Sequence, residues 1–562
     1  MPAQDTCAWA SVPAGRARGA RERVRIVHSA ATKLAQGQSV RATAAAEGVP
    51  ASTLYHYLAR AAAVDAPAGE RDFFSSPCGQ ELLQRIVVAL HLVVCQAGGC
   101  GVDRVAEFLD LTGLDHFVAA SHGYQHGVAV AIERLLGEYG DAQRARLGPG
   151  MPAQSVVLCE DETFHPAMCL VAIAAESDMI LLESYSETRD GATWSALVEK
   201  AVADLPVKVA MVVGDGAKGL IAHAREGLGC HFGPDLFHPQ HDISKATARP
   251  LAARLTTPQA ALTQAEDRTA HWRKAKADYQ EGPRGPGRPT NFDRYIAEAQ
   301  ATEDLARETL AATLRDQAAV RAANRSLSEA YHPFDLVSGA TQTAAVIQTR
   351  FQSAFAIIDE VVGRVGLNER CRPRIDKARR LIPKFVSTMA FFHDRLEATL
   401  AALELPAAVL DTVRHQLVPG LYLARAAKKA RTAAERAAIA AVSDSLLASA
   451  RAAGSPFMDL DLTGRLRVEA VVGACLQLFV RSSACVEGRN GHLALQHHGL
   501  HRLSDPRLKA LTVLHNYYAR RPDGTTAAER FFGQKPDDLF AWLLARIEPP
   551  ALPRARRLRE AA

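Results

Sequence analysis

Short, mostly apolar runs follow one another between residues 155 and 240, and they constrain the fold more than any other feature of this sequence. Five runs have the length and composition of strands: 156–159, 168–175, 179–185, 207–213 and 235–237. The gaps between the first three are too short for a helix, which favours an antiparallel meander. Helical patterns at 193–204 and 217–227 flank the fourth run, which favours parallel pairing there. We therefore predict a mixed five-stranded sheet flanked by helices.

Two short helices joined by a tight turn at Gly48 are predicted near the N-terminus. The first covers 39–47 with Ser39 as its N-cap, and the second covers 54–63. This pattern is typical of a helix-turn-helix, whose second helix enters the major groove of DNA. The alternative is a helical hairpin without a role in DNA binding, and the basic segment 16–25 favours the DNA-binding interpretation. The residues expected to contact bases or phosphates are Arg41, Ser52, Thr53, Tyr55, His56 and Arg60.

Two aspartates directly follow predicted strands. Asp161 follows the first strand and Asp215 follows the fourth, between Gly214 and Gly216. If these strands are neighbours, both carboxylates face one crevice, because ligand sites gather at the carboxyl ends of strands. Carboxylates bind Mg²⁺, and two such ions about 3.5–4 Å apart serve phosphodiester cleavage. The alternatives are that Asp215 caps a helix and that residues 160–162 are a solvated strand end. The pairing of the two strand ends favours a metal site.

Several motifs resemble those of the DDE transposases of bacterial insertion sequences. They are EDETF at 160–164, RDGATW at 189–194, VVGDGAKGL at 212–220, DLFHPQH at 235–241, SSACVEGRN at 482–490 and HNYYARRPDGTTAAERFFG at 515–533. The resemblance implies an RNase H-like catalytic core, and it alone selects Glu487 as a third acid beside Asp161 and Asp215. The three acids would bind two Mg²⁺ ions, with Mn²⁺ as a substitute. His238, Arg489 and Asn490 are candidate auxiliary residues, and Arg481 and Arg489 are expected near phosphates.

The resemblance also implies an activity. The enzyme would hydrolyse a phosphodiester at a transposon end and then transfer the freed 3′-OH to target DNA. Its partners would be double-stranded DNA and at least one further copy of the chain, because two ends must be brought together. Two alternatives stay open at this point. One is a catalytically inactive DNA-binding regulator derived from a transposase, and the other is an RNase H-like nuclease without joining activity.

The fold class predicted for the 562 residues is mostly α with an α/β core. We predict a helix-turn-helix domain at 1–65, followed at 80–148 by a helical region that is either a second helix-turn-helix or an ordinary bundle. The catalytic core is expected in two parts, 150–255 and the C-terminal helices 475–546, separated by a helical insertion at 256–474. A basic disordered tail is expected at 547–562. Residues 1–20 are also expected to be disordered.

Composition adds few constraints. Lys and Arg exceed Asp and Glu by only 5, which is compatible with a nucleic-acid partner without requiring one. The ten cysteines show no regular spacing, which favours reduced thiols in a bacterial cytoplasm, with the protein on the nucleoid. The apolar run from Ile86 to Cys95 is too short to span a bilayer, and the N-terminus lacks the pattern of a signal peptide, so no membrane association is expected.

Overall fold

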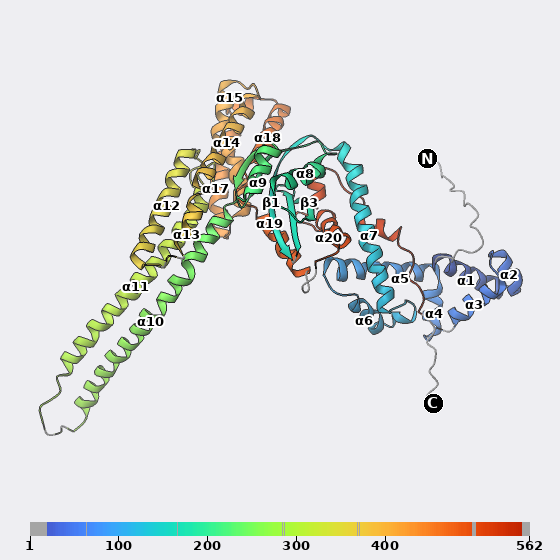
Figure 1. The fold of residues 1–562 in the computed structure, drawn as a ribbon, viewed down its shortest axis with the longest axis horizontal. Coiled ribbons are helices and arrows are strands. Elements are labelled where there is room, and N and C mark those ends of the chain that lie inside the picture. Colours follow the sequence, from blue (N-terminus) through green and yellow to red (C-terminus); the bar gives the residue numbers. More distant parts are fainter. Residues whose placement is uncertain are drawn as a thin grey trace.

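The computed structural model describes most of the chain. The described residues are 20–62, 64–165, 167–283, 285, 287–367, 369, 371–496 and 502–553. The disorder expected for residues 1–19 and 554–562 therefore lies outside the described part. Within it the protein is mostly helical and contains one five-stranded mixed sheet, which confirms the predicted fold class at this level (Figure 1).

The sheet has the order β3-β2-β1-β4-β5. Its strands are β1 (Gln154–His165), β2 (Ala167–Ala174), β3 (Met179–Tyr185), β4 (Val207–Gly214) and β5 (His231–Pro234). The first three form an antiparallel meander, and β4 and β5 pair in parallel with β1 and β4, respectively. Five strands and their mixed pairing were thus predictable from the spacing of the apolar runs.

Two strand boundaries differ from the prediction. The fifth strand is His231–Pro234, whereas residues 235–237 form the turn into the next helix, because the Asp235 carboxylate accepts the backbone N–H of Phe237. Strand β1 continues to His165, so Asp161 lies within the strand rather than after it. The extension follows from the hairpin with β2, which pairs the backbone up to His165 and Ala167 whatever the polarity of the side chains.

Helices cover both faces of the sheet. On one face the buried side chains of α8 (Gly191–Val202) and α7 (His122–Leu147) join those of β1, β2 and β4 in one core. On the other face α19 (Ala484–Gln496) and α20 (Asp505–Tyr517) contribute Val486 and Leu511 to a second core. A sheet that is buried on both faces has strands that are apolar along their whole length, which explains the continuous runs in the sequence.

A long helical segment connects β5 to α19. Its helices are α10 (Phe237–Glu281), α11 (Phe292–Ala330), α12 (Ala344–Val365), α13 (Arg372–Arg379), α14 (Ile382–Ala401), α15 (Ala407–Thr412), α16 (Val418–Lys429), α17 (Ala433–Ala450) and α18 (Leu462–Leu476). Helices α10 and α11 form an antiparallel hairpin that projects far from the body (Figure 1). The predicted boundary at 255/256 falls inside α10, which runs on to Glu281. Its residues up to Leu251 pack in this segment's own core, and the helix also pairs with α11.

The two ends of the helical segment return to the same place. The backbone N–H of Leu236 donates to the carbonyl of Arg481 at 3.1 Å, and that of Ser483 donates to the Asp235 carboxylate at 3.1 Å. We call these four residues the junction. It closes the segment at its base, so that α19 follows directly beside the end of β5.

Three helices form the N-terminal end of the described chain: α1 (Ala20–Ala35), α2 (Val40–Ala46) and α3 (Ala51–Ala62). The Ser39 side chain caps α2 by accepting from the N–H of Ala42, as predicted, and Gly48 has a φ of 64° in the turn between α2 and α3. Only glycine adopts that backbone conformation at little cost.

Helices α4 (Ala68–Ser75), α5 (Pro77–Leu90) and α6 (Asp103–Leu111) lead to α7. Helix α5 continues through a π-helical stretch, His91–Ala97, so the apolar run lies within a helix of 21 residues. Residues 77–97 are the one helix in the described chain that is long and apolar enough to span a membrane, and half of its most apolar window is buried. Leu83 and Val88 on this helix face two different cores of the protein, and core helices commonly meet the same length and composition criteria.

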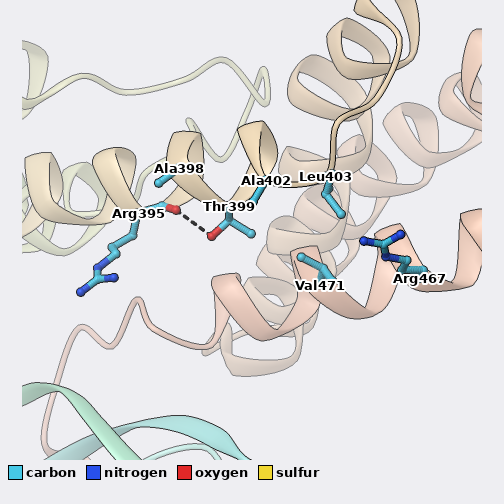
Figure 2. Close-up of a pocket in the computed structure, with 7 residues that line it drawn as sticks. All are labelled: Arg395, Ala398, Thr399, Ala402, Leu403, Arg467 and Val471. Atoms are coloured by element: carbon cyan, nitrogen blue, oxygen red, sulfur yellow. Dashed lines mark hydrogen bonds between the residues drawn. The ribbon is translucent and has the colours of Figure 1, made fainter.

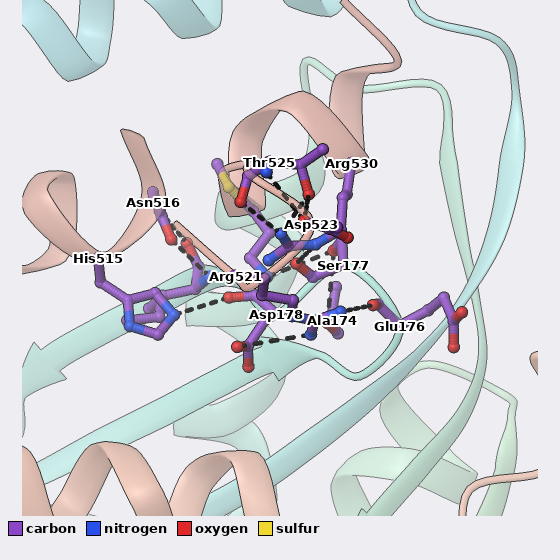
Figure 3. A network of polar contacts seen from close by, with 12 residues as sticks. Ala174, Glu176, Ser177, Asp178, His515, Asn516, Arg521, Asp523, Thr525 and Arg530 are labelled. Atoms are coloured by element: carbon purple, nitrogen blue, oxygen red, sulfur yellow. Dashed lines mark hydrogen bonds and ion pairs between the residues drawn. The ribbon is translucent and has the colours of Figure 1, made fainter. Parts of the chain in front are cut away.

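The C-terminal region holds the turn between β2 and β3 through polar contacts (Figure 3). Arg530 donates to the carbonyl of Ser177 at 2.9 Å, and His515 contacts that of Asp178 at 2.8 Å. Asn516 binds both backbone groups of Ile180, accepting its N–H and donating to its carbonyl, each at 2.9 Å. Because β3 is an edge strand, this amide satisfies groups that no neighbouring strand pairs.

We predict that Asn516→Ala destabilises strand β3, because it leaves a buried N–H and a buried carbonyl without partners. The expected loss of local stability is about 1–3 kcal/mol. Native-state hydrogen exchange of residues 179–185 measures it directly. Gln280→Ala, at an exposed position of α10, is the control and should leave the exchange of β3 unchanged. Equal exchange in both variants would contradict the role given to Asn516.

Candidate active site

The register of β1 and β4 brings two of the predicted acids together. Cys159 is the last residue of β1 that pairs with β4, and its partner is Val213. Two residues further along each strand, Asp161 and Asp215 occupy corresponding positions. The pKa of Asp161 is raised to about 7, first by burial, then by the carboxylate of Glu487, and further by that of Asp215. Each of the two predicted partner acids is therefore close enough to repel the Asp161 carboxylate.

Helix α19 places Glu487 and Asn490 beside β1. The buried side chains of Val486 and Leu493 fix this helix against the sheet. One turn after Glu487, the Asn490 amide donates to the Asp161 carboxylate at 3.1 Å. The side chain of Glu487 is 36% exposed, so it faces solvent on one side of the site.

A pair of thiols marks the same contact between strand and helix. Cys159, two residues before Asp161, donates to the carbonyl of Ser482 at 3.8 Å, and Cys485, two residues before Glu487, lies near the same thiol. The Cys485 thiol and burial raise the pKa of the Cys159 thiol. The two acid-bearing elements are thus in side-chain contact next to the acids themselves.

The acid residue Glu162 also belongs to the site, which sequence reasoning did not select. Burial raises its pKa, and the Asp215 carboxylate raises it further, while Arg189 at 3.8 Å lowers it. Its Oε1 atom is buried without a hydrogen-bond partner. Glu160, in contrast, is fully buried and contacts His223 at 3.3 Å. Glu162 lies on the opposite face of β1 from Asp161, toward Trp194, and is linked to the site through Asp215. We refer to Asp161, Glu162, Asp215 and Glu487 as the acid cluster.

His238 lies at the edge of the acid cluster. Its Nε2 is 3.8 Å from Glu487 Oε1, and its Nδ1 is 2.6 Å from Asp235 Oδ2. The hydrogen bond to Asp235 raises the pKa of His238, and the negative charges of Asp235 and Asp161 act in the same direction. Asp235 is a further buried acid that the sequence did not single out.

Two cationic side chains adjoin the cluster, and both were missed in the sequence. Arg189 lies over the ring of the exposed Phe164, 5.8 Å from the ring centroid. Lys384, from α14 of the helical segment, lies beside Gly216. A Cβ atom added to Gly216 would be 3.6 Å from the Nζ atom of Lys384. Burial lowers the pKa of Lys384, while the Asp215 carboxylate acts to raise it. No local pattern could have identified Lys384, because it is 169 positions from Asp215 in the sequence.

Arg489 does not lie where it was expected. Its side chain is only 2% exposed and forms a two-pronged ion pair with the buried Glu183 on β3, at 2.6 and 2.7 Å. The expectation that Arg489 and Arg481 lie near phosphates therefore finds no support in their contacts within the chain. Arg481 is bonded to the carbonyl and hydroxyl of Ser328. Arg489 thereby ties α19 to β3, and Arg481 ties the segment before α19 to α11.

The predicted DNA-contacting residues differ in their surroundings. Arg41, Ser52, Tyr55 and His56 are exposed, Tyr55 by 68%, and Thr53 is half-buried. Arg60 instead donates to the carbonyls of Leu552 and Pro553 at 2.8 and 3.0 Å. Its expected contact with phosphate is therefore replaced by one within the chain. Residues 547–553, which were expected to begin a disordered tail, are held against the protein. Arg60 bonds two of their carbonyls, and the N–H of Ala551 donates to the Tyr124 hydroxyl.

The donor atoms of the cluster fit a hard divalent cation. The described residues contain no group of three or more His, Cys, Asp or Glu side chains that could hold a metal ion as they stand. However, several carboxylates converge where burial penalises their charge, and the carbonyl oxygen of the Asn490 amide is buried there without a partner. Carboxylate and amide oxygens are the ligands of Mg²⁺.

A separate pocket of about 400 Å³ lies between α14 and α18 (Figure 2). It is lined by Arg395, Ala398, Thr399, Ala402, Leu403, Arg467 and Val471. Thr399 is fifteen residues along α14 from Lys384, which is about 22 Å at the rise of an α-helix. The pocket contains no acid and is not part of the acid cluster.

Comparison with known proteins gives one match. The model of a family of unknown function (DUF6399) matches residues 413–559, about a quarter of the chain. This stretch includes α19 with Glu487 and Asn490, whereas Asp161 and Asp215 lie outside it. No curated protein matches the chain with significance.

The contact between Cys159 and Cys485 allows a direct test of the arrangement. We predict that mild oxidation with diamide, which is reduced to the hydrazine as two thiols form a disulfide, links these residues. The reaction is expected to be slow, because the thiolate is the reactive form and the pKa of Cys159 is raised. Peptide mapping by mass spectrometry identifies the product. Cys485→Ser should abolish it, and recovery of the two peptides only in unlinked form would mean that α19 does not lie against β1.

The crowded charges predict that Asp161→Asn stabilises the protein in the absence of divalent cations. The folded pKa of about 7 exceeds the ordinary aspartate pKa of 3.8, so the carboxylate lowers the free energy of unfolding progressively as the pH rises between these values. The gain in the free energy of unfolding should be absent near pH 4. Because one pKa unit corresponds to 1.36 kcal/mol, the gain should reach at most about 4 kcal/mol above pH 7. Urea denaturation at several pH values measures it. Asp267→Asn, at an exposed position, should show no gain, and a pH-independent difference for Asp161→Asn would contradict the argument.

Proposed function

We propose that the protein is a metal-dependent DNA transposase of the DDE type. The observation that carries this proposal is the meeting of three acids from separate elements: Asp161 on β1, Asp215 after β4 and Glu487 on α19. An arrangement that forces carboxylates together in a partly buried place is costly to the fold, and it is understandable where a cation is to be bound. Structural ion pairs do not account for it, since the charges around Asp161 are mostly of one sign.

The sheet supports the RNase H-like interpretation of the core. Three antiparallel strands precede two parallel ones, and the first strand lies in the centre of the sheet beside the fourth. The resemblance to DDE transposases implies this order. It also implies a third acid on a helix next to the first strand, which is the position of Glu487.

Asp161, Asp215 and Glu487 would hold two Mg²⁺ ions, with Glu162 nearby and Asn490 as a neutral oxygen donor. Bound there, the ions would activate the attacking oxygen and stabilise the leaving 3′ oxygen. The chain's own residues prepare the site. The Asn490 amide orients the Asp161 carboxylate, and Arg189 and Lys384 would supply positive charge for phosphates of the DNA.

Helices α2 and α3 would bind the transposon ends as a helix-turn-helix. The N-terminal half of α3 exposes Ser52, Tyr55 and His56, which is the part of such a helix that reaches base edges. The proposed substrate is double-stranded DNA, so we place the activity on the nucleoid in a bacterial cytoplasm, with a dimer or larger assembly holding two ends.

The test uses DNA duplexes taken from the sequences that flank the gene, where inverted repeats are expected. With Mg²⁺ or Mn²⁺ the protein should release a 3′-OH at the repeat end and join it to a target duplex. The cleavage activities of Asp161→Ala, Asp215→Ala and Glu487→Ala should each fall by more than roughly 100-fold. A loss of that size is typical when only a hydrogen-bond partner of a metal ligand is removed. Asp267→Ala is the matched control for loss of an exposed aspartate.

The outcomes separate the candidate functions. Cleavage without joining would favour an RNase H-like nuclease, and specific binding without cleavage would favour a DNA-binding regulator. Cleavage that survives the loss of Asp161 or Asp215 would refute the assigned site.

A further inference from the structure

We infer that Asp235 is a positioning residue of the acid cluster, which fixes the start of α19 with one carboxylate oxygen and orients His238 with the other. The inference concerns the placement of Glu487 and His238, and its catalytic consequence rests on the proposed function. Asp235 is 1% exposed and lies in the turn between β5 and α10.

The Oδ1 atom of Asp235 joins two distant parts of the chain. It accepts the backbone N–H of Phe237 at 3.1 Å and that of Ser483 at 3.1 Å, 248 positions away. Ser483 directly precedes α19, so its N–H is among the groups near a helix start that need an acceptor from outside the helix. One oxygen thus fixes the first turn of α10 relative to the first turn of α19.

The Oδ2 atom has a different partner. It lies 2.6 Å from His238 Nδ1, and the opposite ring nitrogen, Nε2, lies 3.8 Å from the Glu487 carboxylate. A histidine ring that is bonded at one nitrogen is fixed in orientation and tautomer at the other. Asp235 therefore determines which face and which nitrogen His238 presents to Glu487.

The charge of Asp235 is itself supported by these bonds. Burial alone would raise its pKa, but the hydrogen bonds from His238 and from the N–H of Phe237 outweigh burial and leave the pKa below its ordinary value. Burying an ionised carboxylate costs desolvation energy, which hydrogen bonds from three donors offset here. Such charge-assisted hydrogen bonds are strong, so the carboxylate holds its donors in place. The second connection at the junction, from Leu236 N–H to the Arg481 carbonyl, does not involve the Asp235 side chain.

The two tasks can be separated by substitution. Asp235→Asn keeps an oxygen for the two backbone N–H groups but presents an NH₂ donor to His238 Nδ1. Only the opposite tautomer of the ring can accept from it, so the tautomer that the Asp235 carboxylate selects is lost. Asp235→Ala removes both. Hydrogen exchange of residues 481–487 should therefore be unchanged in Asp235→Asn and faster in Asp235→Ala. The imidazole N–H resonance of His238 in selectively ¹⁵N-labelled full-length protein should shift in both variants.

Activity provides the second readout. Asp235→Asn should lower kcat for end cleavage by about 10–100-fold with little change in KM, as is typical for partners of residues at a metal site. His238→Ala should give a similar loss, and the double variant should be no worse than either, because both remove the same interaction. The control is Asp103→Asn, which disrupts an exposed Asp–His pair at 2.7 Å and should leave kcat unchanged.

The results distinguish failure of the inference from failure of the proposed function. If the wild-type protein cleaves no DNA end, the proposed function fails, while hydrogen exchange and the imidazole resonance still judge the positioning role. Additive losses in the double variant, or an unshifted His238 resonance in Asp235→Asn, would overturn the inference. Slower or unchanged exchange of residues 481–487 in Asp235→Ala would overturn the part assigned to Oδ1.

Discussion

The parallel pairing of β1 with β4 is the constraint on which the site depends. Side chains alternate between the two faces of a strand, so a register shift of one residue would turn Asp161 to the opposite side of the sheet. The register is held by apolar residues on both faces, with Leu158 in one core and Cys159 in the other. A slip would place each of these in the wrong core. The packing of ordinary apolar residues thus secures the juxtaposition of two acids that, by themselves, repel each other.

The sequence was sufficient for the sheet because burial on both faces leaves a strong local signal. It was insufficient where an element's end depends on a partner. Strand β1 continues beyond its apolar part because β2 pairs with it, and residues 235–237 turn because an aspartate accepts a backbone N–H two residues ahead. Both effects follow from tertiary structure or from side-chain bonding, which a pattern of apolar residues does not record.

Charged residues show the same limit within the site. Arg489 looked available for phosphates because it adjoins Glu487, but its partner Glu183 is 306 positions away. Arg60 is bonded to carbonyls more than 490 positions away. The resemblance to known transposases selected Glu487, and the structure brings that residue close to Asp161. It could not indicate Lys384, Glu162 or Asp235, whose relevance arises from the way distant elements meet.

Helix α10 begins in the acid cluster and ends at the far end of the projecting hairpin. Its 45 residues form one helix of about 66 Å, and its first turn carries His238. Pro250 and Pro258, both in the first half of the helix, each remove a backbone hydrogen bond from it. Its first part packs in the core of the helical segment, and α11 runs alongside it. The end of the hairpin and the edge of the acid cluster are therefore parts of one continuous helix.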